Sequence, residues 1–147
     1  MHLNVEIKAR CEDGEGIRRI LEECGAQYHG LDHQIDTYFK VPHGRLKLRE
    51  GNIENYLIFY ERNDQQGPKE SNVILHETEE KSSLKDVLLG ALGSLVVVDK
   101  KRHIYFIDNV KFHVDRVKDL GDFCEIEAID KTDEIGCEKL SAQCQDY

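Results

Sequence analysis

Charged and apolar residues alternate along several short stretches of the chain, a pattern typical of β-strands with one polar face. In the first stretch, residues 2–11, the side chains of Glu6, Lys8 and Arg10 share one face and the apolar side chains share the other. Residues 44–50 repeat this pattern, with three basic residues on alternate positions. The chain is therefore predicted to form strands whose charged faces carry both signs.

Strand-forming composition between turn residues predicts six more strands, at residues 34–39, 54–62, 71–79, 95–107, 109–118 and 120–129. Asp108 and Asn109 are the predicted turn of a long hairpin. Helical spacing of apolar residues predicts helices at 14–24, 84–92 and 132–144. Asp13 is the expected N-cap of the first helix, and Ser83 with Asp86 resembles a capping box at the second.

Hairpin-joined strands with few helices predict an α+β fold with antiparallel pairing. Eight such strands are enough to close into a barrel, with the charged faces turned inward and the helices packed outside. The alternative is an open sheet whose charged face lies in water. No repeat or linker divides the sequence, so residues 1–147 are expected to form one domain.

Composition narrows the function classes. A formal net charge of -9 argues against a nucleic-acid-binding surface. The five cysteines lack CxxC or zinc-like spacing, and no run of about 18 apolar residues could span a membrane. We expect reduced thiols, a cytoplasmic protein and no membrane or nucleic-acid partner, while a homodimer is compatible with the sequence.

Candidate chemistry lies on the charged faces. Carboxylates of the kind that Mg²⁺ or Mn²⁺ prefers are carried by Glu6, Asp115, Glu125 and Glu127. Side chains suited to phosphoryl oxygens are carried by Lys8, Arg45, Lys47, Arg49, Arg62, Lys100 and Arg102. For any one of these residues the alternative is a solvated or cross-strand-paired charge, but seven basic residues in phase favour a phosphate site.

Other polar residues are interpreted as structural or solvent-facing. Hydrogen bonding within the fold is expected for Gln34, Asp36 and Tyr38, and solvent exposure for Lys81, Lys101, His103 and Lys111. His113 is in phase with Asp115 and is interpreted as a structural histidine that could face the interior. The sequence has no GK[ST] phosphate loop and no nucleophile elbow, which argues against P-loop and acyl-enzyme mechanisms.

Together these residues resemble the CYTH group, also called triphosphate tunnel metalloenzymes. The resemblance rests on Asn4-x-Glu6-x-Lys8, Gln34-x-Asp36-Thr37-Tyr38-Phe39, Gly44-Arg45-Leu46-Lys47-Leu48-Arg49, Tyr60-x-Arg62, Lys100-x-Arg102, and Asp115 to Glu127. Within the group the chain is most similar to the class IV adenylate cyclase branch. One residue differs from the signature, because Asn4 stands where the group has a glutamate and an amide offers no charge to a cation.

The resemblance implies a single CYTH-like domain with triphosphate and Mg²⁺ or Mn²⁺ inside an eight-stranded tunnel. It implies metal positions at Glu6, Asp115, Glu125 and Glu127, phosphate-binding positions at the seven basic residues named above, and catalytic positions at Glu6, Lys8, Asp115 and Glu125. The activity it implies first is adenylate cyclase, which converts ATP to cyclic AMP and pyrophosphate. The alternatives are a triphosphatase acting on tripolyphosphate, thiamine triphosphate or a nucleotide, and a non-catalytic polyphosphate or nucleotide binder.

Overall fold

The computed structural model describes residues 2–10, 13–62, 69–79 and 82–130 of the chain. The elements, in chain order, are β1 (His2–Arg10), α1 (Gly14–Glu23), β2 (Gln27–Phe39), β3 (Arg45–Glu50), β4 (Asn55–Arg62), β5 (Lys69–Glu77), α2 (Leu84–Leu92), β6 (Ser94–Ile107), β7 (Val110–Val117) and β8 (Gly121–Asp130). The predicted α+β class is confirmed. The predicted helix at 132–144 lies outside the described residues.

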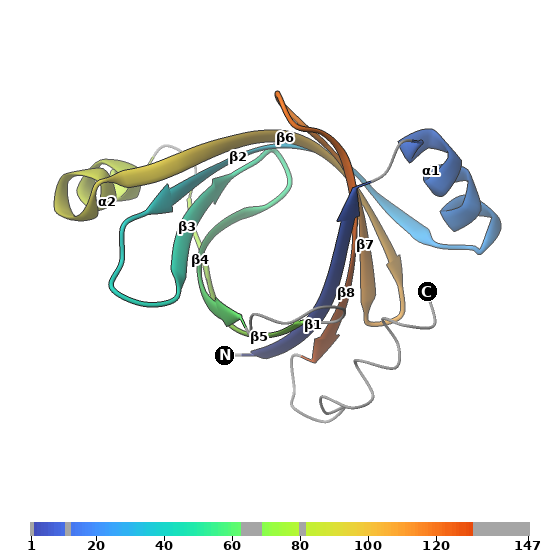
Figure 1. The fold of residues 1–147 in the computed structure, drawn as a ribbon, viewed down its shortest axis with the longest axis horizontal. Helices are drawn as coiled ribbons and strands as arrows, with labels where there is room; N and C mark the ends of the chain where they lie inside the picture. Colours follow the sequence, from blue (N-terminus) through green and yellow to red (C-terminus); the bar gives the residue numbers. More distant parts are fainter. Residues whose placement is uncertain (1, 11–12, 63–68, 80–81, 131–147) are drawn as a thin grey trace.

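Each strand pairs antiparallel with its neighbours in the order β1-β5-β4-β3-β2-β6-β7-β8. The first strand pairs on one side with β5, where Glu6 lies opposite Lys69, and on the other with β8, where Glu6 lies opposite Glu127. This double pairing of β1 completes a ring of strands, seen end-on in Figure 1. The space enclosed by the ring is called the interior below.

The strand β2 is twice as long as the pattern at residues 34–39 predicts, because it pairs with β6 along most of its length. Its register runs from Gln27 opposite Phe106 to Phe39 opposite Ser94. Cross-strand pairing therefore extends a strand whose first half has little pattern of its own. The turn predicted at Asp108 and Asn109 is confirmed, and Asp108 has a φ of 51°.

The two faces of β7 show how the interior becomes polar. All six residues from Val110 to Asp115 are buried. The even-numbered side chains pack outside the ring against α1, in a cluster that also contains Leu21 and Tyr105. The odd-numbered side chains, Lys111, His113 and Asp115, therefore face the interior.

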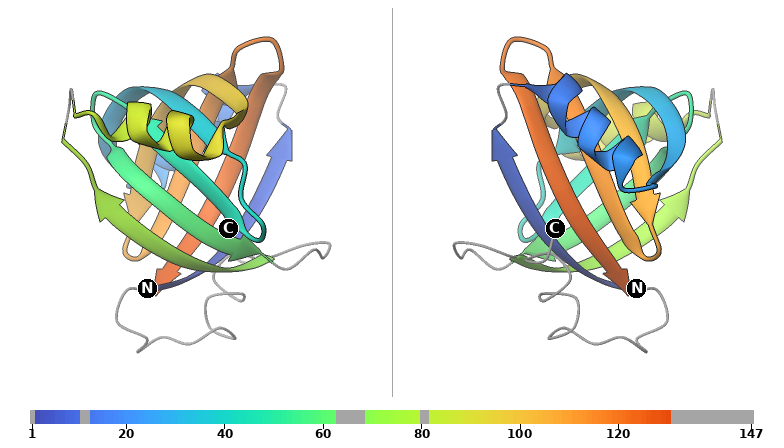
Figure 2. Two further views of the ribbon diagram at one scale, coloured as in Figure 1. Left: turned by 90° about the vertical axis from the view of Figure 1, so that its left-hand side faces the viewer. Right: turned by 90° about the vertical axis from the view of Figure 1, so that its right-hand side faces the viewer.

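The helix α1 covers the outer faces of β7 and β8 (Figure 2). It begins as the sequence predicts: the Asp13 carboxylate accepts a hydrogen bond from the Gly16 N–H at 3.0 Å. Its apolar stripe then places Leu21 in the outer core, 7% exposed. The helix ends before Gly25, whose φ of 77° suits glycine at this position.

The helix α2 packs beside β2 at the far end of the ring and buries no residue completely (Figure 1). The predicted capping box is wrong, because the Ser83 side chain makes no cap hydrogen bond, although the helix does end at Gly93. Nearby apolar side chains of β6 stay in solvent, with Leu95 68% and Val97 57% exposed. Within the described residues, no helix is long and apolar enough to cross a membrane.

Candidate functional site

The interior holds a cluster of cations around one fully buried carboxylate, Asp36 on β2. Arg49, its cross-strand neighbour on β3, donates from Nε at 3.0 Å and from Nη2 at 2.9 Å. Lys100 on β6 donates to Oδ2 at 3.0 Å, and the Lys47 Nζ lies 3.7 Å from the same oxygen. Burial alone would raise the pKa of Asp36, but the charges of Arg49 and Lys100 hold it well below its usual range.

Lys47 and Lys100 each lie near other cations, and the single carboxylate of Asp36 does not balance the resulting repulsion. Burial, together with Arg102 and Arg49, lowers the pKa of Lys100 well below its usual range. Burial and Arg49 also lower the pKa of Lys47. An added anion would favour the charged form of both lysines, so this part of the interior is suited to a polyanion.

A second ion pair lies next to the Asp36 cluster, between neighbouring strands. Arg102 on β6 donates to both carboxylate oxygens of Asp115 on β7, each at 2.8 Å, and both side chains are almost fully buried. A guanidinium has five N–H groups, and this contact engages two of its nitrogens. The carboxylate therefore fixes the orientation of Arg102 and leaves further N–H groups for another acceptor.

The loop between β3 and β4 is held against the interior by Asp32. Its carboxylate accepts backbone N–H groups from Asn52 at 2.8 Å, Ile53 at 2.9 Å and Glu54 at 3.0 Å. A Cβ on Gly51 would lie 2.6 Å from Asp32 Oδ1, so this close approach requires glycine. These contacts position Glu54.

Glu54 in turn connects the loop to two walls of the ring. It accepts from Arg49 at 3.3 Å, from Gln34 at 2.9 Å and from Lys111 on β7 at 2.5 Å. Burial acts to raise the pKa of Glu54, but Lys111 and Arg49 lower it to about 2. Glu54 is therefore an anion at neutral pH and compensates two of the buried cations.

A group of potential metal ligands lies on the adjoining wall, formed by β7 and β8. Ligand atoms of His113, Glu125 and Glu127 all lie within 4.8 Å of one another. Burial raises the pKa of Glu127, and the charge of Glu125 adds to this while Lys111 opposes it. Burial and nearby cations, chiefly Arg102 and Lys111, lower the pKa of His113 well below its usual range. A neutral imidazole beside two carboxylates is a donor set that fits a divalent cation.

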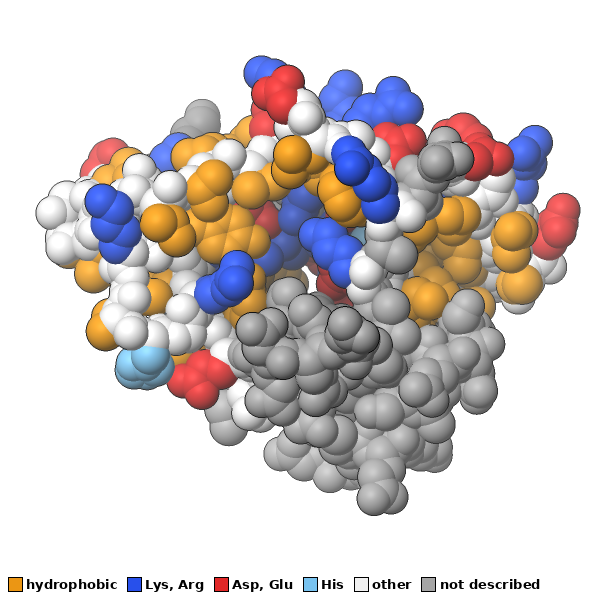
Figure 3. Space-filling view, viewed as in Figure 1, with side chains coloured by type: hydrophobic (Ala, Val, Ile, Leu, Met, Phe, Trp, Pro, Cys, Tyr) orange, Lys and Arg blue, Asp and Glu red, His pale blue; other side chains and the backbone are white. Residues whose placement is uncertain are grey.

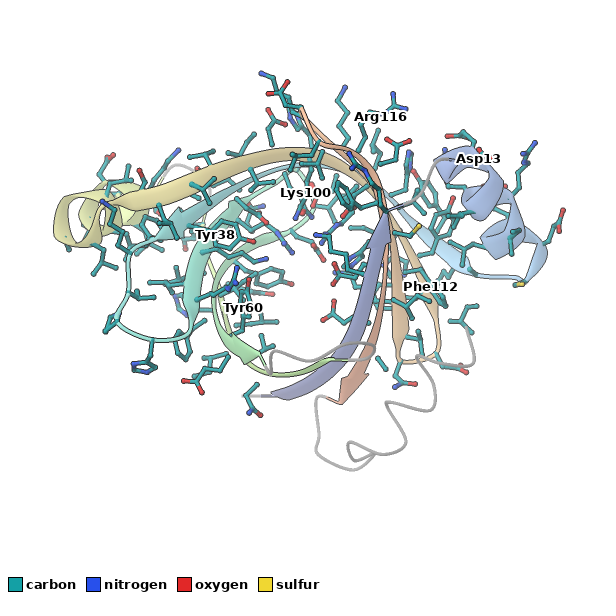
Figure 4. All side chains as sticks on the ribbon, in the orientation of Figure 1. Asp13, Tyr38, Tyr60, Lys100, Phe112 and Arg116 are labelled. Atoms are coloured by element: carbon teal, nitrogen blue, oxygen red, sulfur yellow. The ribbon has the colours of Figure 1, made fainter. Side chains whose placement is uncertain are left out.

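The interior also has an apolar wall. Tyr56, Ile58 and Tyr60 on β4 face the ring interior with Val73 of β5, and three of the four are buried. The Lys47 Nζ lies 5.3 Å from the ring centroid of Tyr60 and 5.4 Å from that of Tyr38. Figure 4 shows Tyr38, Tyr60 and Lys100 on the interior side of their strands.

The sequence-predicted phosphate residues divide into three groups. Lys47, Arg49, Lys100 and Arg102 come together in the interior. Lys8 and Arg45 are exposed, and the Lys8 Nζ lies 5.5 Å from the ring centroid of Phe123. The side chain of Arg62 lies outside the described residues. Figure 3, in the view of Figure 1, shows Lys and Arg side chains around the hollow at the centre of the molecule.

The predicted metal residues are brought together in part. Glu125 and Glu127 lie side by side with His113, and Glu6 is placed opposite Glu127 by the backbone register alone, since its side chain is not described. Asp115 lies instead in the bidentate pair with Arg102. Its part in metal binding stays a prediction, as do the catalytic roles of Glu6, Lys8 and Glu125.

Sequence reasoning missed three interior residues and misplaced one of them. Lys111, assigned to solvent, is 8% exposed and paired with Glu54, so that assignment is wrong. Its spacing from His113 and Asp115 was the available signal. Asp32 is likewise in phase with Gln34 and Asp36, whereas Glu54 lies in a loop and no periodic pattern marks it.

A cavity of about 310 Å³ lies outside the ring, between α1 and the outer faces of β6 and β7. Its lining includes Arg18, Lys101, His103 and Arg116. Arg18 pairs with Glu15, and Arg116 pairs with Asp122. Figure 4 labels Arg116, which lies outside the ring. Its lining also includes Asp115, the partner of Arg102, but none of the cations that contact Asp36.

Comparison with solved structures finds the same fold in proteins from distant organisms. A protein from Pyrococcus horikoshii is 28% identical, with a TM-score of 0.73, and the match covers 97% of this chain and 87% of that one. An adenylate cyclase candidate from Vibrio parahaemolyticus is 16% identical (TM-score 0.70; 98% and 83% covered). An adenylyl cyclase candidate from Hippeastrum, described as having a dominant triphosphatase activity, is 12% identical (TM-score 0.64; 99% and 85% covered).

A comparison with curated protein sequences finds no match. The family model described as the CYTH domain, in contrast, matches residues 2–141, nearly the whole sequence. The matched residues include the antiparallel strands, the interior cations and the group formed by His113, Glu125 and Glu127. The chain therefore belongs to the CYTH family.

Proposed function

We propose that this protein is a metal-dependent enzyme that acts on a small triphosphate, with ATP as the first substrate, inside the ring of strands. The observation that carries the proposal is the cluster of Lys47, Arg49 and Lys100 around Asp36, in the same interior as the His113, Glu125 and Glu127 group. One part offers cationic donors and the other offers metal ligands. A triphosphate with a divalent cation needs both.

Carboxylates orient the two interior arginines, which supports a role for both in binding phosphoryl oxygens. Arg49 and Arg102 each contact a carboxylate through Nε and Nη2, which fixes the plane of the guanidinium. Their remaining N–H groups provide directional donors, and Lys47 and Lys100 provide point charges. In this role the four side chains bind and orient the phosphate chain and stabilise the charge that develops on it during cleavage.

His113, Glu125 and Glu127 would hold the cation, and the backbone register places Glu6 of β1 opposite Glu127. When bound, a divalent cation neutralises phosphate charge and polarises the phosphorus–oxygen bonds under attack. Glu125→Gln is expected to reduce the metal-dependent rate more than substrate binding, because it removes charge from this group and leaves the cation cluster intact.

Two reactions are compatible with this arrangement. Closure of ATP to cyclic AMP requires attack of the ribose 3′-oxygen on the α-phosphate, with pyrophosphate leaving. The apolar wall of Tyr56, Ile58 and Tyr60 supports it, because a nucleoside has an apolar surface to bury and bare tripolyphosphate has none. Hydrolysis requires attack of water on the γ-phosphate, and the triphosphatase activity described for the Hippeastrum protein supports this second reaction.

Product identity separates the two reactions. Purified protein would be incubated with ATP, and separately with tripolyphosphate, in the presence of Mg²⁺ or Mn²⁺, and cyclic AMP, pyrophosphate, ADP and orthophosphate would be resolved. Cyclic AMP with pyrophosphate identifies a cyclase, and orthophosphate identifies a triphosphatase. Lys101→Glu, at an exposed position outside the ring, is the control and should keep the wild-type rate.

A non-catalytic binder is the further alternative, and Asn4 in place of the signature glutamate is the observation that favours it. A binder would retain tripolyphosphate without forming any of these products. If Asn4→Glu then produced turnover where the native chain has none, the binder would be the correct description. Native turnover that depends on the added metal would exclude it.

A further inference from the structure

The side chain of His113 is a buried polar group of the interior. It projects inward from the centre of β7 and is 2% exposed. Among the described residues, neither Nδ1 nor Nε2 has a hydrogen-bond partner. Burying both ring nitrogens without partners costs free energy. A bound group that accepts an electron pair from one nitrogen, or a hydrogen bond from the other, would reduce this cost.

The neighbours of His113 indicate what that group is. Glu125 lies directly opposite on β8, and Glu127 lies two residues further along the same strand face. The ligand atoms of all three side chains lie within 4.8 Å of one another, close to twice a metal–ligand bond of about 2.2 Å. One nitrogen and two carboxylate oxygens are therefore close enough together to bind a single cation.

The chemistry of the donors then narrows the choice of cation. Mg²⁺ prefers oxygen ligands and keeps much of its water, whereas imidazole nitrogen suits first-row transition metals. Resting on the function proposed above, we propose that the His113 nitrogen is a direct ligand of the interior cation, so that the site selects transition-metal ions such as Mn²⁺ over Mg²⁺. The three-residue set of His113, Glu125 and Glu127 is thus a mixed nitrogen–oxygen site.

A structural role for His113 makes different predictions. In that case a buried water or a small side-chain rearrangement would satisfy the imidazole, and an ion held by the carboxylates would show oxygen ligands alone. Metal preference would then be insensitive to the residue at position 113. The two descriptions therefore differ in a spectroscopic property that does not depend on catalysis.

The test uses the full chain, stripped of metal and then given one equivalent of Mn²⁺ without any triphosphate. Pulsed electron paramagnetic resonance would be recorded on unlabelled protein and on protein with ¹⁵N-labelled histidine. We expect a nitrogen hyperfine coupling that changes with the label. The coupling should disappear in His113→Leu and persist in His103→Leu, since His103 contacts Tyr28 outside the ring.

Affinities for Mn²⁺ and Mg²⁺, measured by calorimetry on the same proteins, provide the second measurement. Loss of a nitrogen ligand is expected to weaken Mn²⁺ binding by at least about tenfold, on the scale of other changes to metal-site residues. Mg²⁺ binding should change much less, so the preference for Mn²⁺ falls. His113→Asn serves if the leucine variant does not fold, and the labelled wild-type spectrum needs no variant at all.

No Mn²⁺ binding, an oxygen-only spectrum for the wild type, or unchanged Mn²⁺ affinity in a folded position-113 variant would each overturn the inference. Its failure can be told from failure of the proposed function. Turnover of a triphosphate with an oxygen-only spectrum would refute the nitrogen ligand and keep the enzyme. A nitrogen coupling in a protein without turnover would keep the ligand and refute the enzyme.

Discussion

Asp36 shows how a single residue organises the candidate site. The carboxylate is 0% exposed and contacts three cations from two other strands. Such pairs contribute little net stability compared with apolar packing, but removing one partner leaves the others as uncompensated buried charges. The carboxylate thus keeps Lys47, Arg49 and Lys100 together in the protein without ligand.

Asp36→Asn is expected to lower the free energy of unfolding by about 3–5 kcal/mol, because it removes the charge of the one carboxylate that Lys47, Arg49 and Lys100 share among the described residues. Urea denaturation measures the loss. The control is Asp99→Asn, which removes a partly exposed partner of His33 and should cost less than about 1 kcal/mol. Saturating tripolyphosphate should recover part of the loss in Asp36→Asn, and equal stability of the two variants would contradict the role assigned to Asp36.

Glu54 is expected to make the folded state less stable in acid. Its folded-state pKa of about 2 lies below the ordinary value of 4.5, so its ion pairs stabilise the protein fully above about pH 4.5. This contribution, at most about 3 kcal/mol from the size of the shift, is lost as the pH falls toward 2. Urea denaturation between pH 6 and pH 2.5 should therefore show a smaller acid loss for Glu54→Gln than for the wild type.

The exposed Glu61 supplies the comparison for this measurement. Its carboxylate lies 3.7 Å from His43, with both side chains largely in solvent. Glu61→Gln is expected to follow the wild-type acid dependence. Parallel curves for all three proteins would show that Glu54 does not carry the effect.

At the scale of elements, the outer core under α1 decides that the polar face of β7 turns inward. Tyr105, Phe112 and Val114 pack beneath the helix, and alternation then sends Lys111, His113 and Asp115 to the interior. A single apolar contact surface therefore positions both a buried cation, Lys111, and a potential metal ligand, His113. A substitution that weakens this apolar packing should therefore disturb the inward side chains of β7 although no interior residue is changed.

Leu21→Ala is expected to destabilise the protein by about 2–5 kcal/mol, because Leu21 is 7% exposed in this outer core. The matched variant is Ile20→Ala, next in sequence but 59% exposed, with an expected cost below about 0.5 kcal/mol. Thermal and urea denaturation compare the two. A cost for Ile20→Ala equal to that for Leu21→Ala would show that α1 packs by a different face.

Several elements could be predicted from the sequence because local signals were sufficient. Alternation and strand-forming composition identified the strands, and Asp13 and Gly25 bounded α1. The first half of β2 could not be predicted, because its pairing with β6 and not its own composition makes it a strand. The same holds for the site: Arg49 and Lys100 were in phase, whereas Glu54 reaches the interior from a loop whose path depends on Asp32.

At the scale of the whole molecule, the formal charge of -9 conceals a local cluster of the opposite sign. The interior cations are held by carboxylates that orient them, while most of the negative charge lies elsewhere along the chain. The electrostatic potential that would act on a polyanion in the interior is therefore set by a few nearby residues and not by the net charge of the protein. Salt should weaken its binding less than it weakens contacts at the surface, because buried pairs are screened less.

The most direct test of the central claim is the unfolding free energy of the wild type with and without tripolyphosphate and Mn²⁺. A ligand that binds the interior at 100 times its dissociation constant should stabilise the protein by about 2.7 kcal/mol. Lys101→Glu should show the same stabilisation, and Lys47→Ala, which removes one interior cation, should show less at equal ligand concentration. No stabilisation of the wild type, or equal stabilisation of Lys47→Ala and wild type, would contradict a triphosphate site in the interior.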